Sequence, residues 1–246
     1  MEVLVERETK TVYKEDGKTV KLFVENYSKA AILNEALNQA RAEEGTDLKV
    51  PKLLEVGLVN NRWALISEHI EGNPLDKLMM MYPEKEEEYL NLFVDIQLNI
   101  LSKSVPLLNR MKEKYRRKIN ETNLPDNTKY ELLQRLEGMK KHTKLCHGDY
   151  NPSNIIIKED GTPYIIDWAH VTVGNASGDA AKTFLLFAMN GQENLGNKYL
   201  NLFSEKSGIP MSNIQQWIPI VAAVQKNETK ENQEILDRWI DVVDYN

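Results

Sequence analysis

Three polar residues of the chain have the types and the order that transfer of a phosphoryl group to a hydroxyl requires. Asp149 follows His147 and Gly148, and a carboxylate there could orient a hydroxyl group and accept its proton. Asn154 and Asp167 come next, and both offer the oxygen ligands that Mg2+ prefers. Both are polar at the ends of apolar runs, where strand packing favours apolar residues. The pattern therefore favours a catalytic site over an ordinary turn.

The segment between the two metal-ligand candidates has the pattern of a β-hairpin. Residues 155–158 and 163–166 are mainly β-branched and apolar, and Glu-Asp-Gly-Thr separates them. The Asp160-Gly161 pair is a strong signal for a two-residue hairpin turn. With that turn, the numbers of paired residues add up to 321, and Asn154 lies directly opposite Asp167. Cross-strand neighbours are about 5 Å apart, so we expect the hairpin to bring both side chains to one divalent cation.

The residues from His147 to Trp168 resemble the signature of the aminoglycoside phosphotransferase and choline kinase-like superfamily. Its members carry His-Gly-Asp, an Asn five residues after the Asp, and then Ile-Asp-Trp, as this chain does. The segment Gly178-Asp179-Ala180-Ala181-Lys182-Thr183 resembles the one that follows in that superfamily. The resemblance implies an α+β, bilobal protein-kinase-like fold, with a small antiparallel-sheet N-lobe that contains one helix and a larger, mostly helical C-lobe.

The same resemblance implies a role for each of these residues. Asp149 would be the catalytic base, and Asn154 and Asp167 would be the magnesium ligands. His147 would brace the catalytic loop, and Asp179 would anchor that loop from a helix start without touching substrate. The implied co-substrate is ATP or GTP, with Mg2+ as the cofactor.

Composition and charge are typical of a globular protein with no nucleic-acid partner. The 246 residues suffice for a full core, with 41% hydrophobic and 28% charged residues. A formal net charge of −6 argues against a nucleic-acid-binding protein, which normally has a basic surface. The single Cys146 excludes an internal disulfide, and we expect it to be a buried strand residue. Because the sequence has no signal-peptide pattern and no membrane span, we expect a cytoplasmic protein. We further expect a monomer or a homodimer.

Residues 1–67 are predicted to form the N-lobe. Alternating patterns and turn signals indicate strands at residues 2–7, 11–15, 18–25, 52–59 and 62–68, with turns at Asp16-Gly17 and Asn60-Asn61. Ser28 is a candidate N-cap for a helix that runs to about residue 44 and ends at Gly45. The apolar stripe of this helix consists of Ile32, Leu33, Ala36, Leu37 and Ala40.

Residues 68–74 lose all periodicity and are predicted to be a hinge, and residues 75–246 are predicted to be a helical C-lobe. The hinge resembles that of the superfamily, in which backbone groups of Glu68 and Ile70 would bind an adenine edge. The C-lobe would contain the catalytic loop and the metal-binding hairpin. Its helices are predicted at residues 84–102, 105–119, 126–141, 179–189, 193–207, 211–224 and 230–243.

Lys21 is the candidate for the lysine that contacts the α- and β-phosphates of the nucleotide. The segment Thr19-Val20-Lys21-Leu22-Phe23 resembles the strand-lysine pattern of the superfamily, and Glu35 on the following helix would be its salt-bridge partner. A strand lysine is often a solvated edge residue, so rival residues have to be weighed. These are Lys14, Lys18 and, for the carboxylate, Glu43.

The first predicted turn departs from the kinase pattern. Kinases cover the nucleotide phosphates with a glycine-rich loop, whereas the turn Arg7-Glu8-Thr9-Lys10 contains no glycine. Its backbone therefore has less freedom to approach the phosphates, and the side chain of Thr9 or Lys10 would substitute. This departure leaves open a second hypothesis, a non-catalytic kinase-like nucleotide-binding protein.

The expected activity is ATP-dependent phosphorylation of a hydroxyl group on a small molecule. A protein kinase is disfavoured, because Trp-Ala-His follows Asp167 where protein kinases have Phe-Gly. Asp237, Asp241 and Asp244 have helical spacing, and acidic residues of C-terminal helices often bind cationic alcohols in the superfamily. This favours an amine-bearing acceptor such as an aminoglycoside, choline or ethanolamine. A sugar, homoserine and a macrolide remain open.

Overall fold

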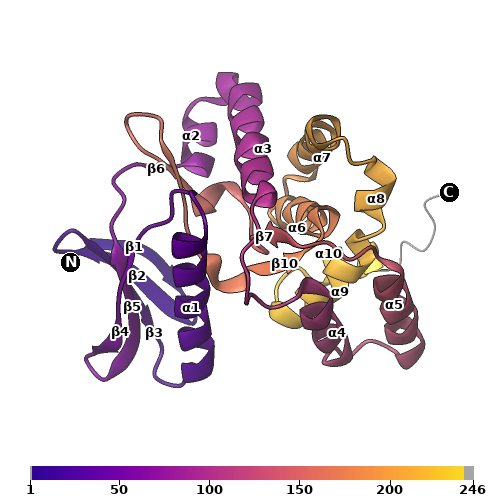
Figure 1. The fold of residues 1–246 in the computed structure, drawn as a ribbon, viewed down its shortest axis with the longest axis horizontal. Coiled ribbons are helices and arrows are strands. Elements are labelled where there is room, and N and C mark those ends of the chain that lie inside the picture. The colour runs from indigo at the N-terminus through magenta and orange to yellow at the C-terminus, as the bar shows by residue number, and fades with distance from the viewer. Residues whose placement is uncertain (1, 241–246) are drawn as a thin grey trace. The chain divides into compact units, whose positions relative to one another are not determined.

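The computed structural model describes residues 2–240, which form two compact units. The sheet unit contains the described residues up to Tyr82 together with residues 152–170, and the helical unit contains residues 83–151 and those from Val171 on (Figure 1). An antiparallel sheet with one long helix in the first unit and a mostly helical second unit confirm the predicted α+β class. The lobe boundaries predicted at residues 1–67, 68–74 and 75–246 stay a prediction.

The sheet unit is built on five antiparallel strands in the order β1-β2-β3-β5-β4. Two tight turns close its hairpins as predicted: Asp16-Gly17 and Asn60-Asn61 all have positive φ, between 49° and 71°. Two consecutive residues of this kind match the right-handed twist of the flanking strands. The strands are β1 (Glu2–Arg7), β2 (Lys10–Glu15), β3 (Lys18–Phe23), β4 (Leu53–Val59) and β5 (Arg62–Glu68).

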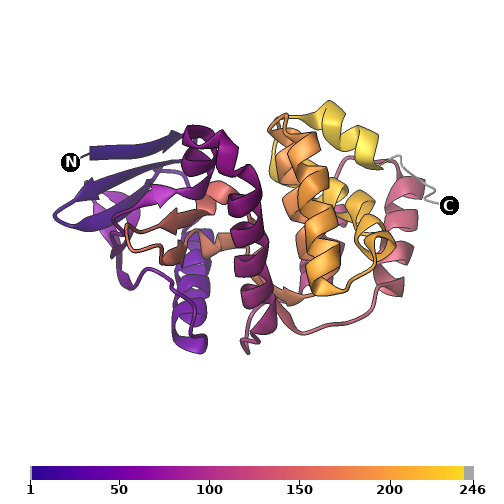
Figure 2. The same cartoon turned by 90° about the horizontal axis from the view of Figure 1, so that it is seen from above.

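The helix α1 (Lys29–Gly45) packs against this sheet, but not with the whole face that its apolar pattern predicts (Figure 1 and Figure 2). Ser28 caps its N-terminus by accepting a hydrogen bond from the Ala31 N–H. Leu33 and Leu37 are 44% and 46% exposed, whereas Glu35 and Asn38 are buried. The predicted stripe is therefore wrong at both leucines. The helix instead buries two polar side chains: Glu35 pairs with Lys21, and Asn38 donates to the Ala169 carbonyl.

The hairpin after the catalytic loop forms, but in a different register from the predicted one. Strands β8 (Ile155–Ile157) and β9 (Pro163–Ile165) pair so that residue numbers add up to 320. Asn154 therefore lies opposite Ile166, whose N–H donates to the Asn154 carbonyl at 3.0 Å, and not opposite Asp167. The loop has three residues rather than two, because Gly161 at φ +82° adds a bulge and Lys158 pairs with Thr162.

Two short elements that the sequence did not predict complete the sheet unit. Strand β6 (Asn73–Pro74) extends the hairpin to the order β6-β8-β9, and the helix α2 (Leu75–Met81) follows it directly. Residues 152–154 and 168–170 form single 3-10 turns on either side of the hairpin.

The helical unit contains most of the predicted helices, with shifted starts. The helix predicted at residue 105 begins only at Met111, because Pro106 and a positive φ of 69° at Leu107 prevent an earlier start. Residues 241–243 of the last predicted helix lie outside the described residues. The helices are α3 (Glu86–Ser102), α4 (Met111–Asn120), α5 (Asp126–Gly138), α6 (Ala176–Met189), α7 (Glu193–Ser207), α8 (Met211–Gln215), α9 (Ile218–Glu228) and α10 (Gln233–Ile240).

An aromatic core in the helical unit holds the chain where the catalytic loop leaves the strand β7 (Lys144–Cys146). Phe93 stacks on Tyr150 with ring centroids 4.4 Å apart, and Phe187 and Tyr199 meet Phe93 edge-on. The Tyr150 hydroxyl donates to the Phe93 carbonyl at 2.6 Å. Strand β7 pairs with β10 (Thr172–Gly174). No helix within residues 2–240 is long and apolar enough to cross a membrane.

Gly72 lies where the chain passes closest to the hairpin, and a side chain there has no room. A Cβ at this position would lie 2.4 Å from the carbonyl oxygen of Ile157 in β8, so backbone has to move. We expect Gly72→Ala to lower the free energy of unfolding by about 1–3 kcal/mol, measured by urea denaturation. Gly138→Ala is the control: nothing lies near its Cβ, and we expect no loss. Equal midpoints for the two variants would contradict this packing.

Candidate active site

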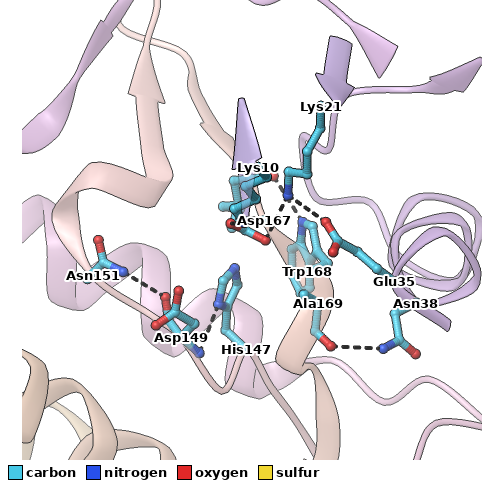
Figure 3. Close-up of polar contacts among 11 residues, drawn as sticks. Lys10, Lys21, Glu35, Asn38, His147, Asp149, Asn151, Asp167, Trp168 and Ala169 are labelled. Carbon is cyan, nitrogen blue, oxygen red and sulfur yellow. Dashed lines mark hydrogen bonds and ion pairs between the residues drawn. The ribbon is translucent and has the colours of Figure 1, made fainter. Parts of the chain in front are cut away.

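A partly buried charge cluster in the sheet unit surrounds Asp167. The Lys21 ammonium in β3 lies 3.1 Å from Asp167 Oδ1 and 2.5 Å from Glu35 Oε1 on α1. The Lys10 ammonium in β2 lies 3.2 Å from Asp167 Oδ2 (Figure 3). The predicted ion pair between Lys21 and Glu35 is therefore present, and it extends to the candidate metal ligand.

The charges of this cluster stabilise one another. Burial opposes ionisation of Asp167, but the ammonium groups of Lys21 and Lys10 hold the pKa of its carboxyl well below the ordinary value. Burial likewise opposes the charge of Lys21, but the carboxylates of Asp167 and Glu35 raise its pKa above the ordinary value. At neutral pH, Asp167 is thus an anion with two ammonium partners, and removing one partner would leave buried charge uncompensated.

The rival residues have other partners. Lys14 pairs with Glu71, and Lys18 is exposed. Glu43 accepts a hydrogen bond from the Leu53 N–H at 3.0 Å. Among the candidates, Lys21 is thus the strand lysine that the fold directs to Asp167.

Local backbone geometry and two hydrogen bonds fix the position of Asp167 at the end of the hairpin. Its φ is +60°, a left-handed conformation that Asp tolerates better than most residues. The Trp168 indole N–H donates to the Ile165 carbonyl at 2.9 Å, and the buried Asn38 amide donates to the Ala169 carbonyl at 3.2 Å (Figure 3). The chain on both sides of the carboxylate is therefore held in place.

The donor set around Asp167 suits magnesium. Mg2+ is bound through one or two protein carboxylates and substrate phosphates rather than by an all-protein cage. Residues 2–240 contain no group of three His, Cys, Asp or Glu side chains that could hold a metal. Asp167 is an anion whose side chain is 23% exposed, and Asn154 is a buried amide; both are hard oxygen donors. The hairpin register does not place them directly opposite one another, and their shared role as ligands stays a prediction.

In the helical unit, several hydrogen bonds hold the loop that carries Asp149. The Asp149 N–H donates to Nδ1 of the fully buried His147 at 3.3 Å, and the Asn151 amide donates to the Asp149 carbonyl at 3.0 Å (Figure 3). Gly148 has φ +78°, and its N–H donates to Asp179 Oδ1 at 2.8 Å. His147 and Asp179 therefore both contact the loop, and the roles that the resemblance implies for them, a brace and an anchor, stay predictions.

A buried network of polar side chains holds Asp179 and the chain near it in position. The Gln97 amide on α3 donates to Asp179 Oδ2 at 3.1 Å, and the Tyr199 hydroxyl donates to Gln97 Oε1 at 2.6 Å. The Thr183 hydroxyl donates to the Tyr150 carbonyl at 2.9 Å. Burial raises the pKa of Asp179 in spite of these donors. The network fixes the loop from three helices.

The chain matches the model of the phosphotransferase enzyme family over residues 20–210. It belongs to that family. No curated protein matches it.

Solved structures show that family members share its fold at low identity. A thermostable mutant of aminoglycoside phosphotransferase APH(4)-Ia, in a ternary complex with AMP-PNP and hygromycin B, is 13% identical with a TM-score of 0.71, over 97% of this chain and 88% of that chain. Choline kinase LicA from Streptococcus pneumoniae is 17% identical with a TM-score of 0.63, over 98% and 93%. The phosphotransferase APH(3'')-Id from Streptomyces rimosus is 18% identical with a TM-score of 0.63, over 91% and 92%. The predicted kinase-like fold is confirmed.

The structure also describes the surroundings of Glu68, a candidate adenine-binding residue, and of Cys146, the single cysteine. The Glu68 N–H donates to the Lys52 carbonyl at 2.9 Å, so this N–H already has a partner within the sheet. Cys146 is fully buried, and burial raises the pKa of its thiol well above the ordinary value, which excludes a nucleophile. Adenine binding by Glu68 and Ile70 stays a prediction.

Sequence reasoning missed the polar residues that position this site from a distance. Gln97 comes directly after Ile96 and four residues after Phe93 on the buried face of α3. Asn38 likewise comes from a buried face, on α1. A polar residue at a position where packing expects an apolar one is the signal that could have found both.

A second buried cluster, also missed, lies in the helical unit. The Glu228 carboxylate on α9 lies 3.3 Å from the Lys182 ammonium on α6 and 3.9 Å from the Lys114 ammonium on α4. Burial lowers the pKa of Lys114 from 10.5 to about 8, although Glu228 opposes the shift. Lys114 is thus a lysine whose charge the fold makes costly.

The lowered pKa of Lys114 predicts a pH-dependent stability. Between pH 8 and pH 10.5 this lysine binds more protons in the unfolded chain than in the folded one, so its contribution to the free energy of unfolding rises with pH. We expect Lys114→Met to be more stable than the wild type at pH 7, and this advantage to shrink as the pH rises through that window. Urea denaturation at several pH values measures it. A stability difference that is independent of pH would contradict the assignment.

Proposed function

We propose that this protein is an ATP-dependent phosphotransferase that phosphorylates a hydroxyl group of a small molecule. The observation that supports this best is the buried cluster in which Lys21 joins Glu35 to Asp167. Holding a carboxylate ionised beside two ammonium groups has little structural use, whereas binding a nucleotide phosphate tail needs these charges. The family match and the kinase-like fold agree with this activity.

In this proposal, the sheet unit binds the nucleotide. Lys21 binds the α- and β-phosphates, and Lys10 substitutes for the backbone donors that a glycine-rich loop supplies in other kinases. The Glu68 carbonyl and the Ile70 N–H bind the adenine edge. Asn154 and Asp167 hold magnesium, which when bound neutralises charge that develops on the phosphate oxygens.

The helical unit supplies the base. Asp149 accepts a hydrogen bond from the acceptor hydroxyl and orients it. As the hydroxyl oxygen forms a bond to the γ-phosphorus, the bond from that phosphorus to the bridging oxygen breaks, and the nucleoside diphosphate leaves with the electron pair. The hydroxyl proton passes to Asp149. His147 and Asp179 keep the loop in position during this transfer.

The class of acceptor belongs to the proposal as well. The sequence favours an amine-bearing acceptor on the strength of three C-terminal aspartates. Of these, Asp237 accepts hydrogen bonds from the Lys226 ammonium at both carboxylate oxygens, at 2.6 and 2.7 Å. Asp241 and Asp244 lie outside the described residues. Preference for ATP over GTP, a cytoplasmic location and a monomer or homodimer are further predictions.

A second candidate function is nucleotide binding without catalysis. The glycine-free first turn favours it, because Lys10 from that turn already pairs with Asp167. Hydrolysis of ATP by the purified protein, with magnesium and without an acceptor, separates the two: a binding protein shows nucleotide-induced stabilisation but no release of ADP above that of the Asp149 variant described next.

Asp149→Asn keeps the shape of the side chain and removes the base. We expect a loss of about 10²–10⁴-fold in turnover, with nucleotide affinity unchanged, since the nucleotide is assigned to other residues. The measurement is release of ADP with a panel of amino alcohols, sugars and antibiotics. Asp126→Asn, at the exposed start of α5, is the control. Full activity of Asp149→Asn on any accepted substrate would refute its role.

Lys21→Met should weaken binding of ATP by about 10–100-fold, the effect of losing one charge-assisted hydrogen bond. Lys18→Met, an exposed lysine in the same strand, should bind as the wild type does. A thermal-shift titration with ATP and magnesium measures both. Asp167→Asn should lose the magnesium dependence of binding. Equal affinities for Lys18→Met and Lys21→Met would contradict the assignment of the strand lysine.

A further inference from the structure

A cavity of about 190 Å³ in the helical unit is lined by the start of α4, the chain that follows α5 and the end of β10. The buried Trp217, which precedes α9, also lines it. With histidine neutral, the charged side chains give this cavity a net charge of +3, although the whole chain has −6. The cations are Arg110, Lys112, Arg116, Lys140 and Lys141, and the carboxylates are Glu113 and Glu137.

The cavity lies at the end of strand β7 that is remote from the catalytic loop. In the pairing of β7 with β10, Lys144 lies opposite Gly174, which lines the cavity. The catalytic loop begins after Cys146, at the other end of β7, about 7 Å further along an extended chain. Among the described residues, those that line the cavity include neither Asp149 nor any other residue of that loop. The cavity is therefore separate from the candidate active site.

Hydrogen bonds fix the chain that forms one wall of the cavity. The Lys112 ammonium, on a side chain that is 15% exposed, donates to the carbonyls of Glu137 and Met139 at 2.9 and 3.1 Å. The amide of the buried Asn175 donates to the Lys140 carbonyl at 3.2 Å. The backbone that carries the cationic residues after α5 is therefore held in place by contacts within the protein.

Two of the five cations in this cavity have no carboxylate partner. Within residues 2–240, no ion pair or hydrogen bond involves the side chain of Lys140 or Lys141, and both residues are exposed. The Lys141 charge acts on Glu137 only beyond ion-pair distance. The other three cations are paired: Arg110 with Glu113, and Lys112 and Arg116 with Glu137.

The positive surface continues beyond the cavity. A neighbouring hollow of about 450 Å³ shares Lys141 and His142 with it. The cations Lys103 and Lys144 also line this hollow, and within the described part of the chain no Asp or Glu does. A surface of one sign of charge raises the local concentration of counter-ions, so anions are drawn to this end of the helical unit.

We infer that the cavity is a second ligand site, which binds a phosphate group of a small soluble molecule, with Lys140 and Lys141 as its counter-charges. A phosphate monoester carries about −1.5 to −2 charges at neutral pH and so matches two lysines, whereas a carboxylate supplies one charge. Arg110 and Arg116 add the forked donors that suit phosphate oxygens. The ligand is small, because the volume of about 190 Å³ is below the roughly 300–1,000 Å³ of pockets for drug-sized molecules.

Glycerol 3-phosphate, glycerate and glycerol are matched probes that share a three-carbon backbone. We expect glycerol 3-phosphate to bind the wild-type protein at least about 10-fold more tightly than glycerate, and glycerol not to bind. NMR titration at constant ionic strength measures the affinities, and the backbone amides of Gly174 and Asn175 report on the cavity itself. Binding of glycerate or glycerol as tight as that of glycerol 3-phosphate overturns the inference, and so do unchanged signals from these two amides.

Variants assign the two counter-charges. Lys140→Gln/Lys141→Gln should weaken binding of glycerol 3-phosphate by at least about 10-fold, and Lys140→Arg/Lys141→Arg should retain most of it. The matched control is Lys198→Gln/Lys206→Gln, which removes two charges from α7, outside the cavity, and should bind as the wild type does. No loss in the first double variant, or an equal loss in the control, overturns the inference.

Macromolecular phosphates are the alternative occupants, and the same variants test them. Vesicles of pure phosphatidylglycerol and a single-stranded oligonucleotide should show no binding that depends on Lys140 and Lys141. Cosedimentation with the vesicles measures the first and gel retardation measures the second. Binding of either one that Lys140→Gln/Lys141→Gln abolishes overturns the assignment to a small soluble molecule.

Binding of ATP separates this inference from the proposed function, on which it does not rest. Lys140→Gln/Lys141→Gln should bind ATP with magnesium as the wild type does, because the nucleotide is assigned to the sheet unit. A loss of ATP binding in this variant would make the cavity part of the nucleotide site and overturn the inference. If the wild-type protein binds no ATP, the proposed function fails, whereas binding of glycerol 3-phosphate that depends on both lysines still supports the second site.

Discussion

A carboxylate that is largely removed from water needs counter-charge, and Asp167, with a side chain that is 23% exposed, makes this constraint central to the sheet unit. Two ammonium groups and a left-handed backbone are needed to hold it. Lys21 is in turn paired with Glu35, so strand β3, helix α1 and the end of the hairpin are joined through three charges. The Asp16-Gly17 turn pairs β2 with β3, and these two strands present Lys10 and Lys21 to one carboxylate.

The helical unit meets a similar constraint with a neutral amide. Asp179 is buried, and it accepts hydrogen bonds from the Gly148 N–H and the Gln97 amide. Next to Gly148, the backbone of the half-buried Asp149 is held by hydrogen bonds at both its N–H and its carbonyl. In both units, a buried polar side chain from a distant helix thus fixes the backbone next to a candidate site residue.

Local chemistry could be predicted from the sequence alone. The turns at Asp16-Gly17 and Asn60-Asn61 form because these residues tolerate positive φ, and Ser28 caps α1 because its hydroxyl satisfies a free N–H. Alternation in β3 put Lys21 on the face where it pairs with Glu35. The motif around Asp149 and Asp167 identified the family. Each of these signals depends on residues a few positions apart.

Contacts between distant segments decided the rest. Helix α1 buries Glu35 and Asn38 and exposes two leucines, because Lys21 and the Ala169 carbonyl lie where only tertiary structure brings them. The bulge at Gly161 shifts the hairpin register by one residue. The sequence spacing alone does not distinguish this register from the one that a two-residue turn predicts. Lys114, Lys182 and Glu228 are separated by 46 or more positions and meet only when three helices pack. Sequence by itself determined the local elements and the motif. Packing determined which charges are buried together, because burial depends on partners that are remote in the chain.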